Sequence, residues 1–125
     1  MRRNTVITFA LLVVAFALSG TAFAQKGTVL RVIVVKTDSL PGYVQELEKG
    51  RALLKSLGVQ ETLRVWSARF AGPEAGSVVV SIEFPSMAAL VDSDNKTNAS
   101  NEYKDWLKGL DKIRKIVSDS LYTEQ

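Results

Sequence analysis

Four stretches of the chain have the residue types or the alternation of apolar side chains that predict β-strands. Residues 28–36, 62–70 and 77–84 are rich in β-branched and aromatic side chains, which favour strands. A weaker alternation over residues 113–123 predicts a fourth strand. In the third stretch one face carries Val78, Val80, Ile82 and Phe84. In the fourth stretch the residues expected to share a face are Ile116, Ser118, Ser120 and Tyr122.

Apolar residues at helical spacing predict two longer helices between these strands. The first covers residues 41–57, with a cap at Asp38 or Ser39 and an end at Gly58. The second follows a cap at Asn98 or Ser100. Its apolar stripe consists of Tyr103, Trp106, Leu107 and Leu110.

A third, short helix is expected directly after the third strand. Pro85 lacks a backbone donor and ends that strand, and Ser86 is a good N-cap for the helix. Residues 92–95 are Asp-Ser-Asp-Asn, which are poor helix formers, so we expect the helix to end there.

Two helices that follow each other count as one crossover, so this order of elements is the βαββαβ pattern of a ferredoxin-like α+β sandwich. Glycine and proline at residues 71–76 predict a hairpin loop between the second and third strands. Helices would then cover one face of a four-stranded sheet and leave the other face bare. The bare face is expected to include Val79, either Trp66 or Val65, and either Leu30 or Val29. A symmetric dimer would cover it.

The first 24 residues have the three parts of a secretory signal peptide. Arg2 and Arg3 precede an apolar run over residues 6–18, and Ala22-Phe23-Ala24 resembles a cleavage site. An uncleaved membrane anchor is the alternative, although the run is shorter than the roughly 20 residues that span a bilayer. We therefore expect a signal peptide at 1–24, one domain at 25–125, a periplasmic or secreted location, and only transient contact with the membrane.

Composition excludes several kinds of chemistry. The formal net charge is +3, and Arg2 and Arg3 supply two of these charges, so the remaining chain is nearly neutral and does not suggest nucleic-acid binding. The absence of cysteine excludes thiol catalysis and cysteine-based metal sites, and the absence of histidine removes the commonest general base and metal ligand. No metal site and no cofactor is expected.

The order of elements, the hairpin over residues 64–76 and the strand-to-helix passage over residues 78–90 resemble the dimeric α/β-barrel superfamily. This superfamily includes the antibiotic-biosynthesis monooxygenase-like proteins. The resemblance implies a homodimer whose two sheets form a barrel, with a pocket between sheet and helices in each subunit. Its members include cofactor-free monooxygenases and haem-degrading enzymes that use a histidine, which this chain lacks.

Four residues on the second and third strands are candidates for a site. Glu83 is the candidate general base, because a dimer interface would partly desolvate its carboxylate. Arg64, Trp66 and Ser81 are candidate ligand-binding residues, since an arginine beside an indole can hold an aromatic or anionic group. The plainer alternative is that Glu83 pairs with Arg64 and that Trp66 only supplies buried area.

Two functions remain open at this point. The first is an exported dimer that binds a small apolar or aromatic ligand or has a structural role. The second is a cofactor-independent monooxygenase acting on an aromatic or quinol-like substrate.

Overall fold

The computed structural model describes residues 27–69 and 72–125. The predicted signal peptide and Phe70 therefore lie outside the described residues. The elements are β1 (Val29–Lys36), α2 (Leu40–Ser56), β2 (Thr62–Ser67), a 3₁₀ turn (Gly72–Glu74), β3 (Val78–Phe84), α3 (Met87–Asn98), α4 (Asn101–Asp111) and β4 (Lys115–Thr123). This is the predicted order.

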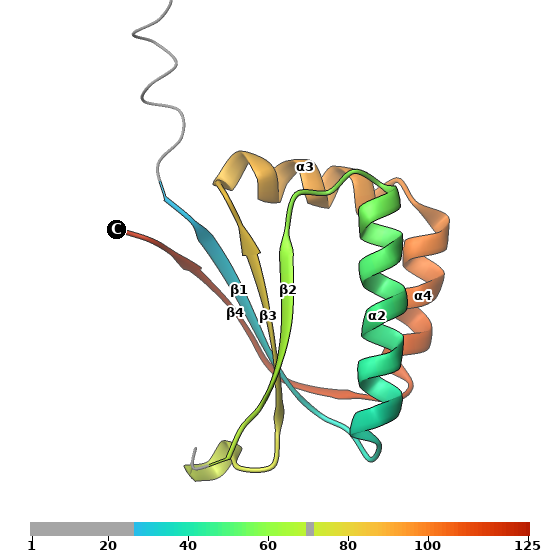
Figure 1. The fold of residues 1–125 in the computed structure, drawn as a ribbon, viewed down its shortest axis with the longest axis vertical. Helices are drawn as coiled ribbons and strands as arrows, with labels where there is room; N and C mark the ends of the chain where they lie inside the picture. The colour runs from blue at the N-terminus through green and yellow to red at the C-terminus, as the bar shows by residue number, and fades with distance from the viewer. Residues whose placement is uncertain (1–26, 70–71) are drawn as a thin grey trace, which may run out of the picture.

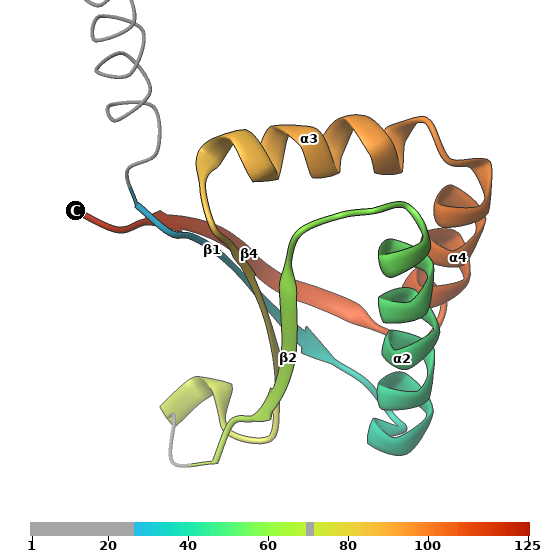
Figure 2. The same ribbon diagram turned by 45° about the horizontal axis from the view of Figure 1, so that its top comes forward.

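The four strands form one antiparallel sheet in the order β2-β3-β1-β4. The helices all lie on one side of it, with α2 and α4 packed side by side and α3 crossing one end (Figure 1, Figure 2). The predicted ferredoxin-like α+β fold is thus confirmed.

The core lies between the sheet and the helices. Val35 pairs with Val78 and Ile33 with Val80, so all four side chains point to the same, helix-covered face. Tyr43 and Leu47 of α2 and Leu110 of α4 complete the buried cluster. Burial of each such side chain stabilises the fold by roughly 1.5–3 kcal/mol.

Serine side chains fix where the helices begin. Ser39 accepts a hydrogen bond from the backbone N–H of Gly42, Ser86 from Ala89, and Ser100 from Tyr103, at 3.1–3.2 Å. Gly58 has a φ of +72°, the left-handed conformation that favours glycine after a helix. These boundaries are those expected from the sequence.

The predicted end of α3 at residues 92–95 is wrong, because the helix continues to Asn98. Lys96 forms an ion pair with Asp92 at 2.8 Å, one helical turn away. The Thr97 hydroxyl donates to the Ser93 carbonyl at 2.9 Å, and both residues are buried. A poor helix former destabilises a helix by only about 0.5 kcal/mol relative to alanine, and these contacts offset that loss.

The alternation predicted for the last strand is wrong at Ile116. A bulge shifts the register, so Val34 pairs with Ser118 whereas Val35 pairs with Ile116. Ile116 therefore shares the helix-covered face with Val35, and Ser118 lies on the opposite face. The second strand is also shorter than predicted and ends at Ser67.

Among the helices of residues 27–69 and 72–125, none covers the other face of the sheet, and we call it the open face (Figure 1). Arg64 pairs with Ser81 and Trp66 with Val79, so these residues share it, and Leu63 and Val65 face the helices. Trp66 is 52% exposed.

Within the described residues, no helix is long and apolar enough to cross a membrane.

Candidate functional site

The open face brings together the four candidate residues of the sequence analysis. Arg64, Trp66, Ser81 and Glu83 line a shallow groove of about 470 Å³, together with Thr28, Leu30 and Val79. The indole N–H of Trp66 donates to the Ser81 hydroxyl at 2.8 Å. Arg64 lies 3.7 Å from the Glu83 carboxylate in an ion pair. Arg64 and Glu83 thus form the ion pair that the plainer alternative predicted. A catalytic role for Glu83 stays a prediction.

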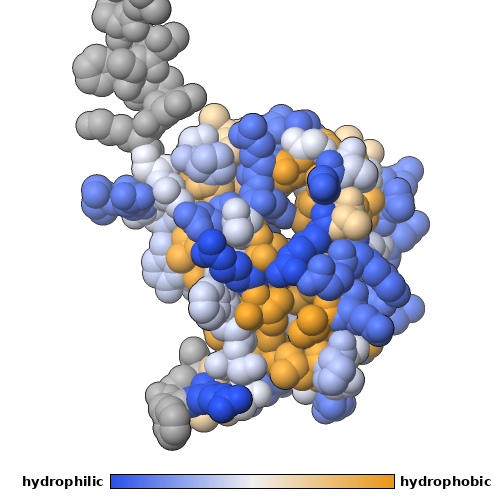
Figure 3. Space-filling model, viewed as in Figure 1, coloured by the Kyte–Doolittle hydropathy of each residue, from blue (hydrophilic) through white to orange (hydrophobic). Residues whose placement is uncertain are grey.

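A second site, which the sequence analysis did not assign to particular residues, lies between the sheet and the helices. It is a cavity of about 300 Å³. Strands and helices both contribute apolar walls, among them Ile33, Leu63, Val80, Ile82, Phe84, Trp106 and Leu107. Its polar lining includes Arg31, Glu61, Asp94, Tyr103, Asp111 and Arg114. Figure 3 shows the surface hollowed between the strands and the helices below α3.

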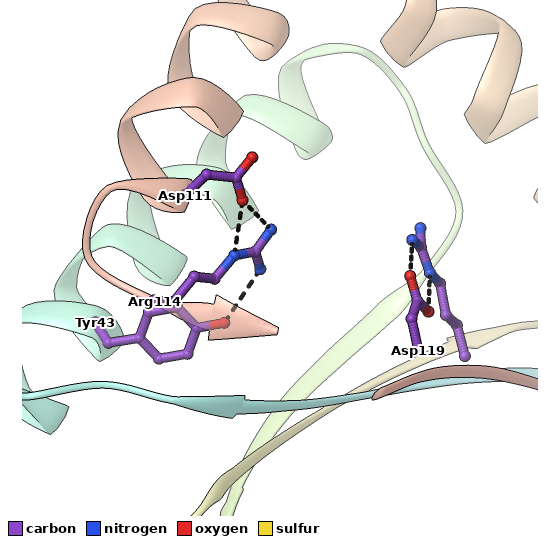
Figure 4. A network of polar contacts seen from close by, with 5 residues as sticks. Tyr43, Asp111, Arg114 and Asp119 are labelled. Atoms are coloured by element: carbon purple, nitrogen blue, oxygen red, sulfur yellow. Dashed lines mark hydrogen bonds and ion pairs between the residues drawn. The ribbon is translucent and has the colours of Figure 1, made fainter. Parts of the chain in front are cut away.

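The sheet supplies one charged pair to this cavity. Arg31 of β1 donates from Nε and Nη2 to the two carboxylate oxygens of Asp119 on β4, at 2.9 and 2.6 Å (Figure 4). These hydrogen bonds lower the pKa of Asp119 and raise that of Arg31. The pair is thus ionised at neutral pH and held in one geometry.

A second charged pair closes the end of the cavity near the α4–β4 turn. Arg114 donates to one oxygen of Asp111 from Nε and Nη2 at 3.1 and 3.0 Å, and to the Tyr43 hydroxyl at 3.3 Å (Figure 4). Only 7% of the Arg114 side chain is exposed, whereas Asp111 is half-exposed. Arg114, which directly precedes β4, therefore links α2 and α4 through one guanidinium.

Glu61 differs from the other acids around the cavity. It precedes β2, and burial raises its pKa to about 7, an effect that the nearby Arg31 partly opposes. Its Oε1 is buried and has no hydrogen-bond partner within the described residues. Burial and the proximity of Glu61 also raise the pKa of Tyr103. Near neutral pH, this carboxyl group can hold or release a proton next to an apolar cavity.

One of these residues carried a signal in the sequence. Arg31 interrupts a face of β1 that is otherwise apolar, with Val29, Ile33 and Val35. A charge at such a position is buried only with a partner, which predicts a polar group inside the fold. Glu61 follows the end of α2 in a connecting segment, where no periodicity indicates its direction.

A larger cleft of about 770 Å³ lies where β1 leads into α2. It is open to solvent, and Lys36, Lys112 and Lys115 on its rim are exposed. Within residues 27–69 and 72–125, no group of three or more acidic side chains could hold a metal ion. The cavity beside Glu61 is less open to solvent than this cleft and is the candidate functional site.

Comparisons with known proteins place the fold. The sequence matches no protein-family model and no curated protein sequence. A protein of unknown function from Bacteroides thetaiotaomicron, described as a possible oxidoreductase, is similar in structure, with a TM-score of 0.57 and 3% identity over 78% of this chain and 98% of that one. A NIPSNAP family protein from Agrobacterium tumefaciens has a TM-score of 0.57 at 9% identity, covering 78% and 91% of the two chains.

SnoaB, a cofactor-independent oxygenase from Streptomyces nogalater, has a TM-score of 0.54 at 14% identity, covering 78% of this chain and 93% of that one. At such low identity these similarities show the fold alone. They confirm the ferredoxin-like fold that the sequence predicts.

Proposed function

We propose that this protein binds a small, partly apolar ligand in the cavity between its sheet and its helices. The observation that carries the proposal is the buried Oε1 of Glu61, which lacks a partner among the described residues although it borders a cavity. A buried polar atom without a hydrogen bond costs about 1–3 kcal/mol, and a ligand that bonds to it would recover this energy. The volume of about 300 Å³ suits one small ring compound.

The proposal includes a homodimer formed through the open face. Tyr122 pairs with Leu30 and so shares this face with Trp66, and the two are 57% and 52% exposed. Leu30 and Val79 line the groove around Trp66. A second copy would cover these apolar side chains. Export to the periplasm or the outside remains part of the proposal and is supported by the composition of residues 1–24.

A second candidate is a cofactor-independent oxygenase acting on an aromatic substrate. The pKa of Glu61 near 7 favours it, because such a carboxylate can accept a proton from an activated C–H or O–H group at neutral pH. In the balanced reaction, a substrate CH₂ group becomes a carbonyl. One atom of dioxygen enters the substrate, and the other leaves as water with the two hydrogens.

Native mass spectrometry of the chain purified from the exported fraction tests the ligand-binding proposal. We expect twice the subunit mass and a further mass from a retained small molecule. Glu61→Gln should lose that molecule and keep the dimer, since Glu61 lines the cavity and does not line the groove around Trp66 on the open face. A ligand retained equally by the wild type and by Glu61→Gln would contradict the placement of the site.

Oxygen consumption separates the two candidates. An oxygenase would consume dioxygen with an aromatic substrate that carries such a CH₂ group, for example an anthrone, and Glu61→Gln would abolish the reaction without loss of fold. A protein that retains its ligand but consumes no oxygen with that ligand is a binding protein.

A further inference from the structure

The charged groups around the cavity are unequal in number. Two are cationic, Arg31 and Arg114. Four are carboxyl groups, Glu61, Asp94, Asp111 and Asp119, of which the last reaches the cavity through Arg31. Asp119 pairs with Arg31 and Asp111 pairs with Arg114, so both cations are balanced. Glu61 and Asp94 then leave the cavity negative once Glu61 is ionised, and a negative cleft attracts cations.

Both guanidinium groups already have carboxylate partners. Arg31 forms two hydrogen bonds with Asp119, and Arg114 forms two with Asp111 and one with Tyr43. An anionic ligand would have to displace a protein carboxylate to gain a cationic partner. Arg51 and Lys55 share a second groove with Glu61, and Arg64 shares a third, but none of these cations lines the cavity. Arg51 already bonds to Glu48 and to the Leu63 carbonyl, and Arg64 pairs with Glu83.

Glu61 and the aromatic side chains give the cavity a hydrogen-bond acceptor and an apolar wall. The buried Oε1 of Glu61 accepts no bond within the described residues, so it offers an acceptor to a ligand. Tyr103 and Trp106 line the cavity with ring centroids 5.5 Å apart, and Phe84 lies in the wall formed by β3. Aromatic faces attract organic cations and also pack against apolar groups.

We propose that the ligand of this cavity is a small organic cation, a protonated amine with an apolar body, whose ammonium group donates a hydrogen bond to Glu61 Oε1. This inference rests on the proposed function and adds the chemical class of the ligand. The apolar body lies against Trp106 and Tyr103. Carboxylates of the same size are rejected, because both cations that line the cavity, Arg31 and Arg114, already have carboxylate partners.

Calorimetric titration with three probes of one shape tests this assignment. Benzylamine, benzyl alcohol and benzoate differ mainly in charge, and at pH about 8 the amine is protonated and Glu61 is ionised. We expect benzylamine to bind at least about tenfold more tightly than benzyl alcohol, since hydrogen bonds between charged groups are about twice as strong as neutral ones. Benzoate should not bind.

Two variants show whether Glu61 is responsible. Glu61→Gln should bring the affinities for benzylamine and benzyl alcohol within about twofold, because the charge is lost while the shape is kept. Glu102→Gln makes the same change on the exposed surface of α4 and should leave the preference intact.

The outcomes separate this inference from the proposed function. Benzoate or benzyl alcohol binding as tightly as benzylamine to the wild type would overturn the inference and leave the proposed function standing. Failure of all three probes to bind at millimolar concentration would contradict both.

Discussion

Two glycines in helices offer the same substitution with opposite expected effects. A methyl group on Gly50 of α2 would lie 2.5 Å from Cη2 and 3.0 Å from Cε2 of Trp106, which is closer than real side chains approach. A methyl group on Gly109 of α4 would meet no atom within 4 Å among the described residues. Gly50→Ala and Gly109→Ala therefore form a matched pair.

Three energies decide whether Gly50→Ala raises or lowers the free energy of unfolding. Replacing glycine by alanine in a helix gains about 1 kcal/mol of propensity. Against this, the Trp106 ring would have to move by about 1 Å, and such overpacking costs about 1–3 kcal/mol. The movement also strains the hydrogen bond from the indole N–H to the Glu46 carbonyl, now 3.0 Å long, which contributes about 1 kcal/mol. We expect Gly50→Ala to lower the free energy of unfolding by about 1–3 kcal/mol.

Urea denaturation of the two variants measures this difference. Gly109→Ala should raise the free energy of unfolding by about 0.5–1 kcal/mol, because only the propensity changes. The melting temperature should change in the same direction as the free energy of unfolding, with Tm lower by about 5–15 °C for Gly50→Ala. If Gly50→Ala proves as stable as Gly109→Ala, Trp106 does not pack against α2, and the wall of the cavity described above is wrong.

Three further substitutions test individual contacts. The free energy of unfolding should decline as pH rises from 4.5 to about 7, because the folded chain keeps the Glu61 proton that the unfolded chain releases. Urea titrations of Glu61→Gln should show no such decline. Asp119→Asn should lower the free energy of unfolding by about 0.5–1 kcal/mol at neutral pH, a small loss because the pair with Arg31 is partly exposed. This difference from the wild type should vanish below the lowered pKa of Asp119, where the carboxyl group is protonated. Ser86→Ala removes the cap that accepts from Ala89 N–H and should lower the free energy of unfolding by about 1 kcal/mol, whereas unchanged stability would show that the cap contributes nothing.

The fold was predictable because its local signals agree with its packing. The alternation of Val78 and Val80 matches a sheet covered on one face, and Ser86 and Gly58 begin or end a helix where they were expected to. The errors have a common cause. Burial of Ser93 and Thr97 and the hydrogen bond between them extend α3 through poor helix formers, and a bulge at Val34/Val35 alters the register of β4.

The site was less predictable, because it depends on side chains from distant parts of the chain. Arg31 and Asp119 are 88 residues apart and meet only when β1 and β4 pair. Glu61 gains its raised pKa from burial, which no local pattern reveals. The candidates on the open face were found because Arg64 and Trp66 are two residues apart on one strand, where alternation alone places them together.

The two tryptophans allow the most direct test of the central claim, that the ligand-binding site lies between sheet and helices. Trp106 lines the cavity and Trp66 the groove of the open face, so a proton–nitrogen NMR spectrum holds one indole signal for each site. A Trp66→Phe variant assigns the two signals. On titration with benzylamine, we predict that the Trp106 signal shifts and saturates while the Trp66 signal stays unchanged. A saturating shift of Trp66 with an unmoved Trp106 would contradict the account and place the ligand on the open face.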